Sequence, residues 1–329
     1  MDLELTSDVI RPGEPVRAEL RGAPAEGAEV SVVGQLSAPF TDDVVRELSA
    51  VVSGDGEVVL PGPNWPVSGQ GPLLRTAWWV VADAEGLPRV SRPLRLDPGP
   101  LVVEGPANDD LDEPVRPQDR RTPIISGLVV VAALVGLITA FGTGEAGVRA
   151  LSGFIGFVAL IPLLGSTWGA AERRSIGYVR CRVDPTAAGL RAVLRAHPPE
   201  GRDASTLVPS VTLYVAESAS ASTSPDRADS REEAIVAERP VDLESDGRAW
   251  WSGTIPWSDL TGLPPSRATE VGRTSVAVTW AVRFHIAVDR GADAERFKPV
   301  LALPDGLDPS LRPRLLLIPQ VVLRSGAGD

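Results

Sequence analysis

The clearest pattern in the chain is an alternation of apolar and polar residues over Ser275–Asp289. Every second residue from Val276 to Val288 is large and apolar, whereas the positions between them are mostly small or polar. A period of two residues is typical of a β-strand with one face in a core. The same pattern recurs in Leu74–Asp83 and in residues 211–215. These segments predict long antiparallel strands.

Short turn motifs separate the strand patterns at close intervals. Asp55-Gly56, Asp246-Gly247 and Asp305-Gly306 are typical of tight turns. Frequent turns between short strand patterns indicate an all-β fold. The sequence therefore predicts two immunoglobulin-like antiparallel β-sandwiches, one on each side of an apolar middle region.

One segment, Asp184–His197, fits two patterns. Leu190, Val193 and Leu194 have a helical spacing, whereas Leu190, Ala192 and Leu194 alternate as in a strand. The turn-forming sequence DPTAAG stands between this segment and an earlier alternating run. We therefore favour a β-hairpin here, with a helix as the alternative.

The middle of the chain holds two uncharged apolar stretches, Ile124–Phe141 and Leu151–Trp168. A helix of either stretch would span about 27 Å, close to the thickness of the hydrocarbon core of a bilayer. The segment between them is too short to return across a membrane. The pattern predicts a transmembrane hairpin of two helices, 124–141 and 151–168, with the lipid bilayer as a partner.

Arginines flank the predicted hairpin on both outer sides, with Arg120 and Arg121 before it and Arg173 and Arg174 after it. By the positive-inside rule, this distribution predicts a multi-pass protein of the cell membrane with both termini in the cytoplasm. Small residues that favour close helix packing recur within the two stretches: Ala132, Gly136, Ala140, Ser152 and Gly156. They predict packing of the hairpin on itself or, alternatively, a homo-oligomer formed through these helices.

The parts before and after the hairpin repeat the order of their motifs. In the first part, Leu60-Pro61 precedes a long strand that ends at Asp83, and Pro93 follows that strand. In the second part, Ile255-Pro256 precedes a long strand that ends at Asp289, and Pro299 follows it. We interpret the two parts as related sandwiches in tandem. The predicted order is an N-terminal sandwich over 1–104, an acidic and Pro-rich linker over 105–122, the hairpin over 123–169, and a C-terminal sandwich over 176–329 with a mobile loop at 217–233.

Charge narrows the classes of partner. The chain of 329 residues has a formal net charge of −11, and residues 1–115 contain 8 Arg against 20 acidic residues. A strongly acidic unit is repelled by phosphate backbones, so nucleic acid is excluded as the expected partner. Lys298 is the only lysine beside many arginines, a bias that suggests a bacterial coding sequence.

Residues for catalysis or metal binding are scarce. The single cysteine, Cys181, alternates with apolar neighbours, which predicts a buried structural thiol. The two histidines, His197 and His285, stand in a Pro-containing loop and on the non-core face of a strand, which does not favour a catalytic role. The acidic clusters Asp42-Asp43 and 109–113 could gather a divalent cation weakly, but neither follows a calcium-loop spacing, and we interpret them as solvated charge. A phosphate-binding Gly-rich loop of the Walker type is absent from the sequence. We therefore predict no catalytic residue, no metal and no cofactor.

Two adjacent pairs of tryptophans, Trp78-Trp79 and Trp250-Trp251, lie on predicted strands. Neighbours on a strand point to opposite faces, so one ring of each pair is expected to face outward. Outward tryptophans often anchor protein interfaces. Trp79 and either Trp250 or Trp251 are thus candidate interface residues, with packing between the sandwiches as the alternative.

The run Val9–Leu20 (VIRPGEPVRAEL) resembles the early strand–turn–strand of arrestin-like domains, in which Pro-Gly-Glu precedes a Val-rich strand. The order of Ile-Pro, Pro-Ser and a long Trp-containing strand in Trp251–Leu303 is similar to the later strands of that family. The resemblance implies a scaffold of two sandwiches that binds partner proteins, often at membranes, and is not an enzyme. It does not extend to the phosphate-sensing residues of animal arrestins.

These observations predict a non-enzymatic, membrane-anchored adaptor whose cytoplasmic sandwiches bind an unknown protein partner. A subunit of an oligomeric membrane channel or transporter is the alternative, because small residues and Pro162 occur in the apolar stretches. A membrane-bound hydrolase is a weaker alternative that rests on the presence of Ser, Asp and two His.

Overall fold

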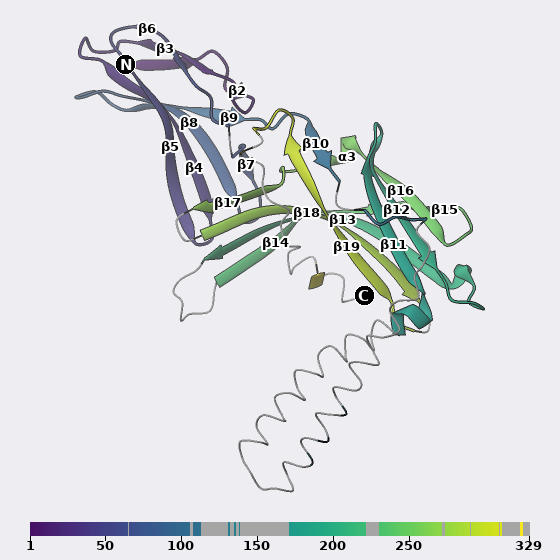
Figure 1. Cartoon of the computed structure of the whole chain (residues 1–329). Helices are drawn as coiled ribbons and strands as arrows, with labels where there is room; N and C mark the ends of the chain where they lie inside the picture. The colour runs from purple at the N-terminus through teal and green to yellow at the C-terminus, as the bar shows by residue number, and fades with distance from the viewer. Residues whose placement is uncertain are drawn as a thin grey trace.

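In the computed structural model, the chain folds mainly into antiparallel β-sheets (Figure 1). The structure describes residues 1–64, 66–105, 108–112, 171–221, 230–271, 274–289 and 291–308, together with residues 131, 135, 138, 310, 323 and 324. The described strands form two β-sandwiches, in agreement with the alternating patterns of the sequence.

The first sandwich packs a small sheet against a larger one. The small sheet has the strand order β1 (Asp2–Leu5), β3 (Val16–Arg21) and β6 (Gly56–Leu60). The larger sheet has the order β2 (Val9–Ile10), β9 (Val90–Leu96), β8 (Arg75–Asp83), β4 (Ala28–Ala38) and β5 (Thr41–Val52), with β7 (Gly69–Gln70) paired to β8. Leu20 and Leu60 of the small sheet share one buried cluster with Trp78 and Val80 of the larger sheet. This shared core makes the two sheets a sandwich.

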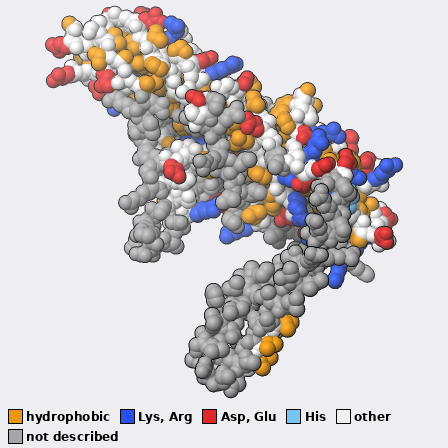
Figure 2. All heavy atoms as spheres, viewed as in Figure 1, with side chains coloured by type: hydrophobic (Ala, Val, Ile, Leu, Met, Phe, Trp, Pro, Cys, Tyr) orange, Lys and Arg blue, Asp and Glu red, His pale blue; other side chains and the backbone are white. Residues whose placement is uncertain are grey.

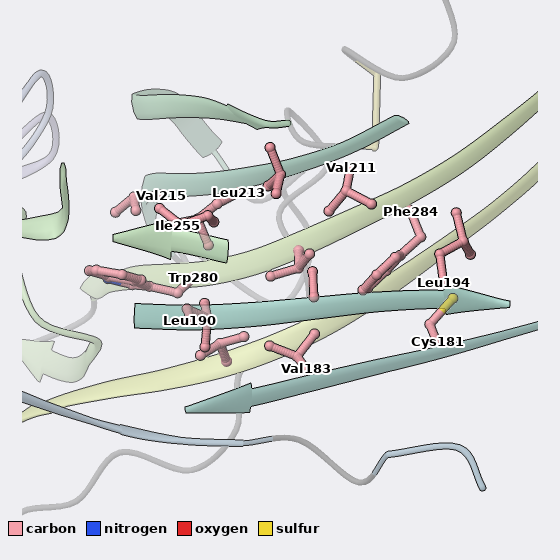
Figure 3. Close-up of a cluster of buried hydrophobic side chains, with 14 of the residues drawn as sticks. Cys181, Val183, Leu190, Leu194, Val211, Leu213, Val215, Ile255, Trp280 and Phe284 are labelled. Atoms are coloured by element: carbon pink, nitrogen blue, oxygen red, sulfur yellow. The ribbon is translucent and has the colours of Figure 1, made fainter. Parts of the chain in front are cut away.

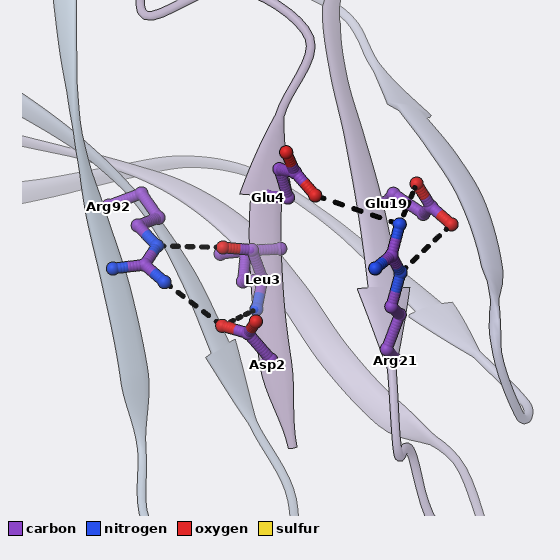
Figure 4. A network of polar contacts seen from close by, with 6 residues as sticks. All are labelled: Asp2, Leu3, Glu4, Glu19, Arg21 and Arg92. Atoms are coloured by element: carbon purple, nitrogen blue, oxygen red, sulfur yellow. Dashed lines mark hydrogen bonds and ion pairs between the residues drawn. The ribbon is translucent and has the colours of Figure 1, made fainter.

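Polar contacts join the two sheets of the first sandwich at one edge (Figure 4). Nε of Arg92 on β9 donates to the carbonyl oxygen of Leu3 on β1 at 2.7 Å, and its Nη2 lies 2.9 Å from a carboxylate oxygen of Asp2. On β3, Arg21 pairs with Glu19 at 3.0 Å. These side chains are largely exposed, so the ion pairs contribute little to the stability of the fold.

The second sandwich has the same construction. Its small sheet has the order β11 (Tyr178–Pro185), β12 (Gly189–His197), β16 (Trp250–Pro256) and β15 (Glu244–Ser245). Its larger sheet has the order β10 (Leu101–Glu104), β19 (Ala294–Pro304), β18 (Thr274–Val288), β13 (Leu207–Ala221) and β14 (Ser230–Val241), with β17 (Arg267–Val271) paired to β18. The turn η2 (Ala204–Thr206) precedes β13, and the short helix α3 (Trp257–Leu260) follows β16. Figure 3 shows the core, where Leu190 and Leu194 of β12 face Trp280 and Phe284 of β18.

The two sandwiches repeat one strand connectivity. In chain order, β3, β4, β5, β6, β7, β8 and β9 correspond to β12, β13, β14, β16, β17, β18 and β19. The repeat extends to side chains. Nε1 of Trp78 donates to the carbonyl oxygen of Pro66 at 2.8 Å, and Nε1 of Trp280 donates to that of Pro264 at 2.9 Å. The sequence repeat is therefore also a repeat of structure.

The β-hairpin interpretation of Asp184–His197 is confirmed. β11 and β12 pair in antiparallel register from Tyr178 with His197 to Pro185 with Leu190. Ala192 and Leu194 point into the core, and Val193 on the opposite face is buried as well. Burial on both faces is the reason that the apolar residues also matched a helical spacing.

The segment after the first sandwich differs from the predicted linker. Leu101–Glu104, assigned by its pattern to the end of the first sandwich, pairs as β10 with β19 of the second. Asn108 and Asp109 then bind the edge of β11. Nδ2 of Asn108 donates to the carbonyl oxygen of Val183 at 3.1 Å, and a carboxylate oxygen of Asp109 accepts from the backbone N–H of Cys181 at 3.0 Å. The composition of residues 105–122 predicts a solvated linker. Asn108 and Asp109 instead form hydrogen bonds with the backbone of β11.

The predicted loop over residues 217–233 is also corrected. β13 extends to Ala221 and β14 begins at Ser230, while residues 222–229 lie outside the described residues. The segment contains few large apolar residues, which favoured a loop. However, Glu217, Ala219 and Ala221 continue the buried alternation of β13, which pairs with β14 and β18 as far as Ala221.

The predicted transmembrane hairpin is overturned. Across the part of the chain that the structure describes, no helix is both long enough and apolar enough to cross a membrane. The segments 124–141 and 151–168 lie outside the described residues except for Val131, Val135 and Ile138. The predicted helix-packing residues Ala132, Gly136, Ala140, Ser152 and Gly156 also lie outside them. The prediction was drawn from length and apolarity, two properties that do not by themselves establish a membrane span. The assignment to the cell membrane with two cytoplasmic termini depended on the hairpin and is withdrawn with it.

Candidate functional site

A cavity of about 770 Å³ lies where the two sandwiches meet. Its walls come from β7, β10, β17 and β18 and from the turn after α3, which Figure 1 places at the junction of the sandwiches. Most of the wall is apolar, with contributions from Leu74, Val103, Val236, Leu260, Val278 and Trp280. Glu217 and Arg267 are its deeply buried charged residues among those that the structure describes. A cavity of this size with a few convergent polar groups has the character of a ligand pocket.

Glu217 of β13 connects the second sandwich to the backbone of the first. Its side chain is buried, with 2% of the residue exposed. One carboxylate oxygen, Oε2, accepts hydrogen bonds from the backbone N–H groups of Leu73 and Leu74 at 2.8 and 3.0 Å. A Cβ atom at Gly71 would stand 1.9 Å from Oε1 of Glu217, so this approach requires a glycine. The Glu217 carboxylate therefore supplies the hydrogen-bond acceptor that these two N–H groups need. An apolar side chain at position 217 would leave both N–H groups without this acceptor.

Burial shifts the pKa of the Glu217 carboxylate. Loss of solvent around the carboxylate raises its pKa, while the two backbone N–H groups and the positive charge of Arg267 act in the opposite direction. The pKa of Glu217 is raised overall because desolvation is the largest of these effects.

Arg267 of β17 is the second buried charge, with 5% of the residue exposed. Nη1 donates to the hydroxyl oxygen of Thr76 on β8 at 2.9 Å, across the junction of the sandwiches. Nε and Nη2 are buried and have no hydrogen-bond partner among the described residues. Desolvation lowers the pKa of Arg267 to about 10, although the charge of Glu217 opposes this shift. One edge of a buried guanidinium is thus left unsatisfied beside the cavity.

The internal repeat shows that Arg267 is not required by the sandwich fold. Ser68 and Ser266 occupy equivalent positions, and each hydroxyl accepts a backbone N–H from β9 or β19. The next residue is Gly69 in the first sandwich and Arg267 in the second. The first sandwich forms the same strand pairing without an arginine at this position. The guanidinium is therefore an addition to the repeated framework.

A smaller polar cavity of about 560 Å³ lies between residues 108–110 and strands β11 and β19. Nζ of Lys298 lies 2.9 Å from a carboxylate oxygen of Asp109, whose other oxygen accepts the N–H of Cys181. These charged groups satisfy one another and hold the segment after β10 on the second sandwich. We assign this cavity a structural role.

The candidate interface tryptophans point in different directions. Trp251 lies in the core of the second sandwich. Trp250 points outward, with the guanidinium of Arg195 at 4.9 Å from the centre of its ring. Trp79 lies half-buried on the outer face of β8, opposite the buried Trp78. The predicted alternation within each pair is confirmed, and a role of Trp79 or Trp250 in an interface stays a prediction.

The residues considered for chemistry lie away from the cavity. Cys181 is fully buried, and desolvation raises the pKa of its thiol to about 12, which confirms the prediction of a structural thiol. Burial lowers the pKa of His197, as do the charges of Arg195 and Arg180. Nε2 of His285 lies 3.6 Å from the carboxylate of Asp293. No set of three or more His, Cys, Asp or Glu among the described residues could hold a metal ion, and the expected lack of a cofactor stays a prediction.

The sequence reasoning missed Glu217 and Arg267. The signal for Glu217 was present, because the alternation of Val211, Leu213 and Val215 places the next inward position at residue 217. For Arg267, no local pattern indicates burial, since the groups that cover it come from the other sandwich. Figure 2 shows that acidic side chains are scattered over the first sandwich, as its composition predicts, whereas the buried charges at the junction are a separate feature.

Comparisons with known proteins do not identify the chain. No family model matches it, and no curated protein matches it. Among solved structures, it is similar to a chain of the CsuC–CsuE chaperone–tip adhesion subunit pre-assembly complex from the archaic chaperone-usher Csu pili of Acinetobacter baumannii. The sequence identity is 8%, the match covers 90% of this chain and 98% of that chain, and the TM-score is 0.21. A TM-score of this size carries no conclusion about function.

Proposed function

We propose that the protein is a non-enzymatic adaptor that binds a partner protein through the cavity between its two β-sandwiches. The observation that carries this proposal is the cavity of about 770 Å³ with an apolar wall and a buried, unsatisfied guanidinium edge. Binding pockets commonly combine a mainly apolar surface with a few placed polar groups.

The arrangement of the two sandwiches supports a binding role. Leu36 and Leu74 of the first sandwich pack into the hydrophobic core cluster of the second, and Glu217 adds hydrogen bonds across the same junction. The two sandwiches that border the cavity are thereby held in fixed relation to each other, which lowers the conformational cost of binding a partner. The resemblance to arrestin-like domains favours the same interpretation, since those domains form two-sandwich scaffolds for partner proteins.

The test is affinity capture with a variant that fills the cavity. Thr261 is exposed, lines the cavity and is the C-cap residue of α3. We expect Thr261→Trp to leave the fold intact and to abolish recovery of partners that the native full-length chain retains. The partners are identified by quantitative mass spectrometry of captured complexes.

Thr206→Trp is the matched control. Thr206 is an exposed threonine at the end of a helical turn, and its hydroxyl donates to the carbonyl oxygen of Asp203 at 2.8 Å. The hydroxyl of Thr261 likewise donates to the carbonyl oxygen of Trp257 at 3.2 Å. Recovery of the same partners by both variants would contradict binding through the cavity.

A further inference from the structure

We infer that the cavity recognises a carboxylate attached to an apolar group, and that the free edge of Arg267 binds this carboxylate. The inference rests on the proposed function, because it names the chemistry that the cavity recognises.

Nε and Nη2 of Arg267 lie on the same edge of the planar guanidinium, so that their N–H bonds are nearly parallel. The two oxygens of a carboxylate match this edge and accept both hydrogens side by side. Nη1 on the other side of the group is already bonded to Thr76. The free donors therefore form one complete bidentate site.

The charge of Arg267 also lacks a close counter-ion. A buried cation is costly unless it is paired and hydrogen-bonded. Glu217 is the nearby carboxylate, but its Oε2 is bonded to the amides of Leu73 and Leu74. No ion pair joins Arg267 to a carboxylate within the described part of the chain. An incoming anion would remove this cost.

A monoanion fits the local field better than a dianion. Glu217 and Asp97 are the acidic residues of the cavity, and when ionised they oppose a phosphate dianion more strongly than a carboxylate. The wall beside Arg267 includes Val278 and Trp280, which can bury an apolar body. A free C-terminal carboxylate of an apolar peptide and a small apolar organic acid both meet these requirements.

Entry to the site requires a small shift of the cavity wall, since Nε and Nη2 are shielded from solvent. The wall strand β7 has two residues, both exposed, and Gly69 pairs with Thr76, the residue that holds Arg267. We place the shift at the two residues of β7 themselves, because they are exposed, whereas the flanking Ser68 and Gly71 are hydrogen-bonded to Leu96 and Leu74.

The test measures binding of matched probes to the full-length chain by calorimetry and by tryptophan fluorescence, to which Trp280 in the wall contributes. The first pair is an N-acetylated apolar tripeptide with a free C-terminal carboxylate and the same tripeptide with a C-terminal amide. The second pair is octanoate and octanamide. We expect at least one carboxylate to bind about tenfold or more tightly than its amide, because the amide loses the charge and the second acceptor oxygen. Preference for the peptide identifies a chain terminus, and preference for octanoate identifies a small acid.

Variants assign the effect to Arg267. Arg267→Lys keeps the charge but loses the planar fork, so we expect carboxylate binding to weaken by about tenfold or more. Arg267→Met should abolish the preference for carboxylate over amide. Circular dichroism verifies folding of each variant, and Thr261→Trp blocks the cavity with Arg267 intact in case a substitution at Arg267 unfolds the chain.

Arg95→Lys is the control, because Arg95 lines the same cavity at an exposed position. Equal binding of carboxylates and amides, or an equal loss of affinity in Arg95→Lys and Arg267→Lys, would overturn the inference. The partner capture with Thr261→Trp is a separate measurement. If Thr261→Trp loses a captured partner but the native chain binds no carboxylate, the proposed function stands and the carboxylate site is rejected. If the native chain binds a carboxylate but captures no partner through the cavity, the carboxylate site stands and the proposed function is rejected.

Discussion

Glu217 and Arg267 are buried at the same junction but differ in how their charges are satisfied. The carboxylate of Glu217 accepts two backbone N–H groups, whereas the guanidinium of Arg267 uses one nitrogen and leaves an edge without a partner in the described residues. Removing a partner from a buried polar group costs more than the hydrogen bond contributes. Glu217 therefore stabilises the junction, and Arg267 is retained at a cost in stability that a bound anion would offset.

Cys181 provides a prediction at the scale of a single residue. Its thiol is fully buried and its pKa is raised to about 12, so we expect no reaction with a thiol reagent such as DTNB at pH 8 in the folded protein. In urea, the same thiol should react completely. The raised pKa also means that the folded state binds this proton more tightly than the unfolded chain, so its contribution to stability is present below pH 9 and is lost as the pH rises toward about 12. Stoichiometric labelling of the folded protein within minutes would contradict this assignment.

At the scale of elements, the buried tryptophans of β8 and β18 are anchored in the same way in both sandwiches. The strands beside them differ, because Gly34 of β4 stands opposite Trp78 and Val215 of β13 stands opposite Trp280. A Cβ atom at Gly34 would lie 2.6 Å from a ring carbon of Trp78, far inside van der Waals contact. The ring of Trp78 therefore occupies the space that a side chain at position 34 would need.

Gly34→Ala is expected to destabilise the first sandwich by about 1–3 kcal/mol, because the added methyl group overpacks the core against Trp78. The free energy of unfolding is measured by urea denaturation followed by circular dichroism. Gly56→Ala in β6 is the control, since a Cβ atom there meets no described atom within 4 Å. If Gly34→Ala were as stable as Gly56→Ala, the close packing of Trp78 on β4 would be refuted.

The sequence predicted the strands whose alternation is carried by large side chains, such as β8, β18 and the β11–β12 hairpin. It failed where the inward residues are small or charged, as at the end of β13, because Glu217 and Ala219 carry little hydrophobic signal. It also failed for β10, since four residues cannot indicate which of two similar sheets they join. The two apolar stretches were misjudged because a hydropathy pattern does not specify the surroundings of a segment. The candidate site escaped prediction because its residues come together only when two sandwiches pack.

At the scale of the whole molecule, the junction couples the two sandwiches through both apolar and polar contacts. Leu36 and Leu74 extend the hydrophobic core of the second sandwich into the first, and Glu217 and Arg267 bond to β8 and to the turn before it. We therefore expect the described part of the chain to unfold as a coupled unit, with Glu217 as a main determinant of the coupling.

Gly71→Ala tests this coupling. The added methyl group would displace the carboxylate of Glu217 from the amides of Leu73 and Leu74, at an expected cost of about 1–3 kcal/mol in the free energy of unfolding. Gly69→Ala on the same segment is the control, because a Cβ atom there meets no described atom within 4 Å. The cost should largely vanish in the Glu217→Ala background, where no carboxylate remains to be displaced. A double-mutant cycle that gives additive losses would show that Gly71 and Glu217 act independently.

The position of β10 has a consequence for synthesis of the protein. This strand leaves the ribosome directly after the first sandwich, yet its partner β19 follows all the other described strands of the second sandwich. The strands of the first sandwich are all made before β10, while the larger sheet of the second sandwich stays open at one edge until β19 has been made. A chain truncated before β19 would therefore keep all the strands of the first sandwich. It would expose β10 as an unpaired strand, whose free backbone N–H and C=O groups favour aggregation.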